Sequence, residues 1–423
     1  MNARLRATTL GVGAILLLAG CSSVEPAPDT SGGTDQAPDP AACVPDPAAV
    51  VQAPAQNRDQ PLPDDLTARI DAAVQGAFAD TGAPGAIVGV SSPEGTWIAA
   101  YGSADAETNQ AMTPSTHTRV GSITKTLTGT AAIQLAQDGL IAMDDTIGQY
   151  RDGIPNGDDV TLLMLANMTS GIASYTMQDE FADALYSDPS RTFTIDELIQ
   201  IGVDASPSFA PGEGFEYSNT NTLLLGEVIE QVTGKPLGTV LEEQVIAPLG
   251  LEHTSWPGDT PEMPEPYAHG QTAQGLDADG VHDATRWNPS WAGGAGKIIS
   301  TVDDLLVYGH ALATGQGLLD AETAAWRLGT FPEGPLGYGA GFACFGGWVG
   351  HEGSMPGYNT QLVYDTGSAT TVAVAVNSDV TAGSCEADSD GEGLEDPRCL
   401  TPASRILIPV SKVLGNEFTP PGA

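Results

Sequence analysis

The chain has 423 residues and carries 15 Lys+Arg against 54 Asp+Glu, a formal net charge of −39. Nucleic acid and anionic lipid headgroups would repel such an acidic chain, so charge-driven binding to either is excluded. An apolar fraction of 41% is sufficient for a hydrophobic core, and the length predicts one large or two ordinary domains. Lysine is scarce, and the chain has four of them: Lys125, Lys235, Lys297 and Lys412.

The N-terminus has the features of an export signal. Arg4 and Arg6 precede an apolar run over residues 11–18, which is shorter than the roughly 20 residues of a membrane-spanning helix. The run ends in Leu-Ala-Gly-Cys at Cys21, a sequence that resembles a bacterial lipobox. We therefore expect residues 1–20 to be a lipoprotein signal peptide. Cys21 would then be lipidated and would anchor the protein on the outer face of the cytoplasmic membrane, with an ordinary secretory signal as the alternative.

Residues 21–62 are rich in Pro, Ala and Asp, and they predict a disordered tether before a folded part at residues 63–418. Four cysteines follow Cys21, and an oxidising compartment permits them to form disulfides. Four cysteines allow three pairings, among which sequence does not choose. We expect Cys344 to pair within the 385–399 segment, and Cys399 is the candidate partner.

The folded part begins and ends with strands and helices that flank a helical middle. Hydrophobic periodicity predicts a helix at 66–79, a hairpin with strands at 86–90 and 96–101, three strands at 346–350, 361–364 and 370–376, and a helix at 403–414. Strands from both ends of a chain imply one α/β domain that is interrupted by an inserted helical domain. We place the α/β part at about 63–120 and 291–418 and the helical part at about 121–290, with a ligand site in the cleft between them.

The first motif that carries chemistry is Ser122 followed by Lys125, at the start of a helical pattern. The i, i+3 spacing places both side chains on one helix face. A serine hydroxyl is a weak nucleophile until a nearby base takes its proton, and a desolvated lysine with a lowered pKa can do so. Such a pair is common by chance, and taken alone it also fits an exposed lysine on a surface helix.

Two further motifs follow in the chain. Tyr217-Ser218-Asn219 comes after a Pro-Gly loop, so that Tyr217 could relay a proton and Asn219 could bind Lys125 and a substrate amide. The third motif, 351–354 (His-Glu-Gly-Ser), follows an apolar strand, and its flanking glycines would let a substrate backbone lie close to the strand edge.

The three motifs together resemble those of the penicillin-recognising serine hydrolases, namely S-x-x-K, Y-x-N and H/K-x-G. The resemblance extends over about 66–415 and is strongest to serine-type D-alanyl-D-alanine carboxypeptidases and class C β-lactamases. It implies a β-lactamase/transpeptidase-like fold, in which helices flank an antiparallel sheet and a helical domain is inserted.

The resemblance also implies residue roles. Ser122 would form an acyl-enzyme, Lys125 and Tyr217 would move protons, and Asn219, His351, Gly353 and Ser354 would bind substrate. The backbone N–H groups of Ser122 and Ser354 would form the oxyanion hole. No metal or cofactor is implied, and we expect a monomer that acts on a small peptide, ester or β-lactam.

The sequence departs from the carboxypeptidase pattern in the third motif. Those enzymes carry a hydroxyl residue in its middle and a basic residue nearby, which together bind the terminal carboxylate of the substrate. Here the middle residue is Glu352, and residues 337–344 contain no Arg or Lys. Alternate strand residues face opposite sides, so Glu352 is free to point away from the substrate, and Lys297 is a candidate for the missing charge.

Three functions therefore stay open. The first is a D-alanyl-D-alanine carboxypeptidase-like or β-lactamase-like hydrolase, and the second is an esterase or D-amino-acid amidase on the same scaffold. The third is a non-catalytic lipoprotein that binds peptidoglycan or a protein partner. The segment 386–397 begins like a calcium loop, but Pro397 stands where an EF-hand needs Glu, so an acidic solvated loop is expected there.

Overall fold

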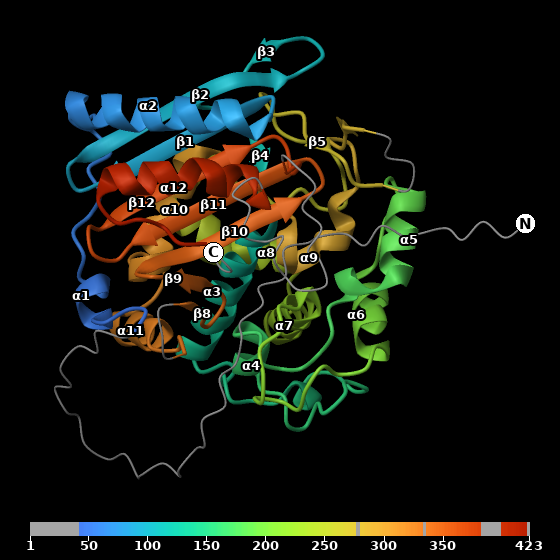
Figure 1. Ribbon diagram of the computed structural model, residues 1–423. Coiled ribbons are helices and arrows are strands. Elements are labelled where there is room, and N and C mark those ends of the chain that lie inside the picture. Colours follow the sequence, from blue (N-terminus) through green and yellow to red (C-terminus); the bar gives the residue numbers. More distant parts are fainter. Residues whose placement is uncertain (1–41, 276–279, 333–335, 382–398, 421–423) are drawn as a thin grey trace, which may run out of the picture.

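The computed structural model describes residues 42–275, 280–332, 336–381 and 399–420 (Figure 1). The expected signal peptide, Cys21, Cys385 and the 386–397 segment lie outside these residues. Within the described part, no helix combines the length and apolar character that crossing a membrane requires.

The core of the protein is an eight-stranded antiparallel sheet in the order β3-β2-β1-β12-β11-β10-β9-β8. β1 pairs with β2 on one side and with β12 on the other, so strands from the two ends of the chain are neighbours. The strands are β1 (Gly85–Ser92), β2 (Gly95–Asp105), β3 (Gln110–Ala111), β8 (Leu336–Tyr338), β9 (Ala343–Phe345), β10 (Trp348–Met355), β11 (Tyr358–Asp365) and β12 (Thr370–Val376).

Helices cover both faces of this sheet. α2 (Asp64–Thr81) and α12 (Pro402–Leu414) lie side by side on one face, and α10 (Val302–Thr314) covers the other (Figure 1). Strand alternation explains this two-sided core: in β1, Val88 packs with the α2 and α12 side chains, whereas its neighbour Ile87 faces the α10 side. The predicted hairpin, the last two strands and the first and last helices are confirmed.

The middle of the chain consists of helices and loops, as expected, and contains two small ladders. Its helices are α3 (Thr124–Gln137), α4 (Leu162–Ala166), α5 (Asp179–Ser187), α6 (Ile195–Asp204), α7 (Asn219–Thr233), α8 (Leu237–Leu241) and α9 (Gly293–Gly296), and α11 (Ala321–Leu328) follows α10. Short turns of helix lie at η1 (Gly121–Ile123), η2 (Ile147–Gln149), η3 (Tyr175–Met177), η4 (Glu242–Ile246), η5 (Ala247–Leu249) and η6 (Pro289–Ala292). The ladders are formed by β4 (Thr118–Arg119) with β7 (Ile299–Ser300) and by β5 (Gln271–Thr272) with β6 (His282–Asp283).

The expectation of a disordered tether over 21–62 is wrong for its second half. Residues 42–62 fold onto the domain, where α1 (Pro47–Val51) packs against α11. The side chain of Asp46 accepts a hydrogen bond from the Ala49 N–H and so caps this helix, and Pro47 suits its first turn. Val50 and Leu62 are buried, so a few well-placed apolar residues are sufficient to order a segment rich in Pro and Ala.

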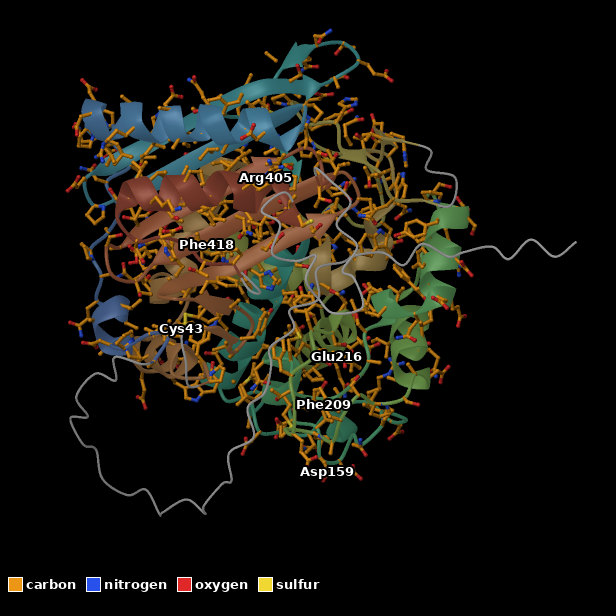
Figure 2. The ribbon with its side chains drawn as sticks, in the orientation of Figure 1. Cys43, Asp159, Phe209, Glu216, Arg405 and Phe418 are labelled. Atoms are coloured by element: carbon orange, nitrogen blue, oxygen red, sulfur yellow. A yellow bond between two sulfur atoms is a disulfide. The ribbon has the colours of Figure 1, made fainter. Side chains whose placement is uncertain are left out.

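The predicted disulfide between Cys344 and Cys399 is also wrong. Cys344, in β9, is bonded to Cys43, just before α1, with their Cα atoms 6.2 Å apart. Figure 2 shows Cys43 beside α1, at the end of the molecule where α11 lies. Cys399 is disulfide-bonded as well. The prediction failed because Cys43 was assigned to the tether and was therefore taken to be far from the folded core.

The strands next to the third motif also differ from the expectation. The strand predicted at 346–350 is β10, which begins at Trp348 and includes the whole 351–354 motif instead of ending before it. Gly346 and Gly347 have positive φ angles of 61° and 91° and form the turn that precedes it. β8 and β9, which were not predicted, extend the sheet beyond β10.

Candidate active site

Ser122 and Lys125 lie where η1 continues into α3. The N-terminal ten residues of α3 are all buried, so the helix forms a rigid platform for both side chains. Lys125 Nζ donates hydrogen bonds to Ser122 Oγ at 2.9 Å and to the Ala295 carbonyl oxygen at 2.8 Å. The predicted contact between nucleophile and base is therefore present, and the Ala295 carbonyl fixes the lysine on its other side.

Burial is the main influence on the pKa of Lys125. Its side chain is 1% exposed, and this desolvation lowers the pKa of Lys125 well below its usual value. Nζ lies 4.9 Å from the centroid of the Tyr217 ring, whose π face offers a weak compensating attraction for an ammonium group. Among the described residues no carboxylate contributes to its pKa, so the amine is biased towards the neutral form that can accept a proton.

Tyr217 reaches the same point from the loop before α7. Its hydroxyl is hydrogen-bonded to Ser122, and this bond lowers its pKa, but burial has the larger effect and raises the pKa above the usual value. Glu216, the preceding residue, lies in the helical region of the molecule (Figure 2). The Ser122 hydroxyl therefore has Lys125 and Tyr217 as its two neighbours, one from each of the first two motifs.

Asn219 does not bind Lys125 in this structure. Its Nδ2 donates to Thr176 Oγ1 at 2.8 Å, and its backbone N–H donates to Ser174 Oγ at 3.0 Å. Ser174, which precedes η3, and Thr176 within it were not predicted as neighbours of the site, because their positions depend on tertiary packing. The Asn219 side chain is half-buried, and in the sequence Asn219 follows Tyr217 by two positions.

The third motif meets the first through unusually close backbone contact. A methyl group on Gly353 would come within 1.8 Å of the Val120 carbonyl oxygen, and one on Gly121 within 2.8 Å of the Ser354 amide nitrogen. Gly121 also has a positive φ of 52°, which disfavours other residues. Thr360 holds this approach together by donating to the Val120 carbonyl at 2.9 Å. The Ser354 amide thus lies beside the residue that precedes Ser122, as an oxyanion hole requires.

His351 points into the protein, and a second residue, Tyr338, accompanies it. His351 is 5% exposed, and its Nε2 is 2.9 Å from the Tyr338 hydroxyl, while its Nδ1 is bonded to the Glu352 carbonyl oxygen. Both ring nitrogens are therefore engaged inside the protein. Sequence reasoning missed Tyr338, for which the available signal was an aromatic residue between two glycines just before the third motif.

Glu352 lies on the α12 side of the sheet, and its charge contributes to the raised pKa of Tyr217. Asn359 Nδ2 donates to its Oε1 at 3.0 Å, and Thr401 and Gln361 also hydrogen-bond to the carboxyl group. Burial raises the pKa of Glu352, and these three hydrogen bonds partly oppose that effect. Gln361 is its cross-strand partner and donates to Ser404 of α12, which confirms which face of the sheet this side chain occupies.

Lys297 does not supply a free positive charge. Its Nζ forms an ion pair with Asp259 at 2.6 Å and lies 5.0 Å from the centroid of the Trp256 ring. The lysine side chain is only 5% exposed. The suggestion that Lys297 replaces the missing basic residue of the third motif is therefore wrong, because Asp259 already neutralises it.

Comparisons with known proteins identify the family of this chain. The family model described as Beta-lactamase matches residues 70–393. Esterase EstB from Burkholderia gladioli is 30% identical over 285 residues, which are 60% of this chain and 72% of the esterase.

Two solved structures share the fold. A D-stereospecific amidohydrolase from Streptomyces sp. superposes with a TM-score of 0.67 at 32% identity, covering 74% of this chain and 94% of that one. A D-amino acid amidase from Ochrobactrum anthropi SV3 gives a TM-score of 0.69 at 26% identity, covering 83% of this chain and 98% of the amidase. These matches confirm the predicted fold class, and the chain belongs to the beta-lactamase family of serine hydrolases.

Proposed function

We propose that this protein is a serine hydrolase that cleaves esters and amides without a carboxylate on the leaving group, D-amino-acid amides among them. The observation that carries the proposal is that, among the residues that the structure describes, no available cation lies beside the third motif. Burial favours the neutral form of Lys125, Lys297 is paired with Asp259, and the adjacent strands β8 and β9 contain no Arg or Lys. A substrate carboxylate would lose its water there without gaining a counter-charge.

Nearby arginines do not change this conclusion. Arg327 is 2% exposed and donates to the Ala340 carbonyl and to Thr130 Oγ1 within the core. Arg119 is 1% exposed and donates to the Pro261 carbonyl. Both guanidinium groups thus serve the protein's own backbone and hydroxyl groups.

The chemistry follows from the contacts of Ser122. Neutral Lys125 accepts the hydroxyl proton as Ser122 Oγ forms a bond to the substrate carbonyl carbon, and the carbonyl π electrons move to its oxygen. The N–H groups of Ser122 and Ser354 stabilise this oxyanion, an interaction whose loss typically costs about 10²–10³ in rate. The carbonyl then re-forms, and the leaving group departs with a proton from Tyr217, which Lys125 restores. Water hydrolyses the resulting ester and frees Ser122.

The names of the relatives support this choice among the open functions. One matched relative is called an esterase, and two matched structures are called a D-stereospecific amidohydrolase and a D-amino acid amidase. A non-catalytic binding protein would have no need of a buried lysine in contact with a serine hydroxyl.

We also propose that the protein is exported and anchored through Cys21. A Cys21→Ala variant would then move from the membrane fraction to the medium.

The decisive experiment uses two substrates that differ only in the leaving group. An acylated D-alanyl-D-alanine and its C-terminal amide present the same D-alanyl–D-alanine bond, with and without a carboxylate, and the rate is followed as release of D-alanine or D-alaninamide, which excludes hydrolysis of the terminal amide. We expect kcat/KM to be at least about tenfold higher for the amide, equivalent to about 1.4 kcal/mol of carboxylate desolvation. A preference for the free acid would refute the proposal and favour a carboxypeptidase.

Three controls complete the experiment. Ser122→Ala must abolish turnover of both substrates. D- and L-phenylalanine amide and a nitrophenyl ester then define the acyl preference. Labelling by a fluorescent penicillin tests the β-lactam alternative, and a lack of Ser122-dependent turnover and labelling with every probe would leave the binding-protein alternative standing.

A further inference from the structure

Tyr338 connects the outer strands of the sheet to the candidate active site. It ends β8, is 4% exposed and pairs with Ala343 of β9, and its hydroxyl lies 2.9 Å from His351 Nε2. The sequence gives Tyr338 no role, and its hydroxyl is too deeply buried to meet a substrate. It contacts two residues of the candidate site instead, His351 and Tyr217.

The hydrogen bonds of His351 define which ring nitrogen carries the proton. A backbone carbonyl can only accept, so the bond between Nδ1 and the Glu352 carbonyl requires a proton on Nδ1. In the neutral ring Nε2 is then an acceptor, and the Tyr338 hydroxyl must donate to it. Burial lowers the pKa of His351 to about 3, so that the ring is neutral at working pH.

The rings of Tyr338 and His351 both pack against that of Tyr217. The centroid of the Tyr217 ring is 6.1 Å from that of Tyr338 in an edge-on arrangement and 6.0 Å from that of His351. Tyr338 and His351 themselves meet edge-on at 5.5 Å. Such a three-ring contact restricts the rotation of Tyr217, whose hydroxyl bonds to Ser122.

We propose that Tyr338 is a positioning residue, which holds His351 as its neutral Nδ1–H tautomer and thereby fixes the ring of Tyr217 against Ser122. This inference rests on the proposed function, because the positioned group serves the serine chemistry. Tyr338 acts through His351, without touching the substrate. Loss of its hydroxyl leaves Nε2 buried without a donor, so the imidazole rotates or changes tautomer and the three-ring contact loosens.

A matched pair of substitutions tests this role. Tyr338→Phe removes the hydroxyl and keeps the ring. Tyr308→Phe is the control, since Tyr308 is equally buried and its hydroxyl makes a 2.8 Å hydrogen bond to Thr126 Oγ1. On the best ester substrate we expect Tyr338→Phe to lower kcat about tenfold with KM changed less than twofold, and Tyr308→Phe to leave kcat within twofold. Equal losses in both variants would mean a purely structural role and would overturn the proposal.

A double-mutant cycle tests whether the effect passes through His351. In a His351→Ala background, Tyr338→Phe should lower kcat by less than twofold, because the group that it positions is gone. The same tenfold loss in both backgrounds would overturn the proposal. Thermal denaturation of all variants confirms that each is folded at the assay temperature.

A spectroscopic measurement separates failure of this inference from failure of the proposed function. In ¹⁵N-histidine-labelled protein, the resonances lost in His351→Ala belong to His351. We expect them to report the neutral Nδ1–H tautomer between pH 5 and 8 and to shift in Tyr338→Phe, whether or not any substrate is turned over. An Nε2–H tautomer, or titration of His351 within that range, would refute the role of Tyr338 directly.

Discussion

The disulfide between Cys43 and Cys344 should be a major source of stability, although Cys43 lies in a segment that sequence reasoning assigned to the tether. The two residues are 301 positions apart, so the bond closes most of the folded domain into one loop. In the chain-entropy model a loop of that length stabilises the protein by roughly 5–6 kcal/mol at 25 °C, and measured losses on removing native disulfides are about 2–5 kcal/mol.

The perturbation is the double substitution Cys43→Ala with Cys344→Ala. We expect the free energy of unfolding in guanidinium chloride to fall by about 2–5 kcal/mol, seen as a lower midpoint. Cys43→Ala alone breaks the same bond and should lose nearly as much as the double variant. Val50→Ala is a packing control: it weakens the contact of α1 while the disulfide stays intact, and it should cost less.

The location of the bond predicts a functional consequence as well. Cys344 pairs with Gly337 of β8 and with Val349 of β10, so it lies between the strands that carry Tyr338 and His351. We expect the double variant to lose activity at a temperature below its unfolding midpoint. A stability loss under about 1 kcal/mol would refute the reasoning, because the N-terminal segment would then hold its place without the covalent bond.

Three further predictions concern single groups. Lys125→Arg should lower kcat/KM by at least about 10²-fold, because a guanidinium stays protonated and cannot accept the Ser122 proton; a smaller loss in an ester assay would contradict the role of Lys125 as base. Glu352→Gln should change the ratio of activities on the free acid and the C-terminal amide by less than twofold, since this side chain faces α12; a larger change would place it at the substrate. Burial raises the pKa of Asp379 from 3.8 to about 6, against opposing hydrogen bonds from Thr272 and Gln274, so its stabilising contribution is present below about pH 4 and is lost as the pH rises through 6. Relative to Asp379→Asn, the wild type should therefore lose about 2.4 kcal/mol between pH 4 and pH 7 in denaturant unfolding, and a pH-independent difference would contradict the shift.

Sequence was sufficient where one local pattern determines the outcome. The continuous apolar run of β12 and the i, i+3 spacing of Ser122 and Lys125 are both patterns formed by residues close together in the chain. Prediction from the sequence failed where segments that are distant in the chain come into contact. Nothing local connects Cys43 to Cys344 across the whole domain, and Tyr338 gains its role only because β8 and β9 extend the sheet beside β10. The direction of Glu352 was left open, and it follows from the register of β10 with β11.

Electrostatics around Ser122 follow one rule, although the groups differ in chemistry. Burial lowers the pKa of Lys125 and of His351, and it raises the pKa of Tyr217 and of Glu352. Each of these shifts favours the uncharged form. The chain as a whole carries a net charge of −39, but the buried groups around Ser122 are therefore biased towards their uncharged forms.

A neutral site has two consequences for the proposed reaction. Lys125 can act as a base without a carboxylate beside it, since desolvation alone favours its free amine. In the same low-dielectric surroundings, charge appears mainly on the oxyanion that forms during the reaction, where the N–H groups of Ser122 and Ser354 stabilise it most strongly. A substrate that brings its own carboxylate would introduce a second negative charge, and so the neutrality that activates Ser122 also selects against such substrates.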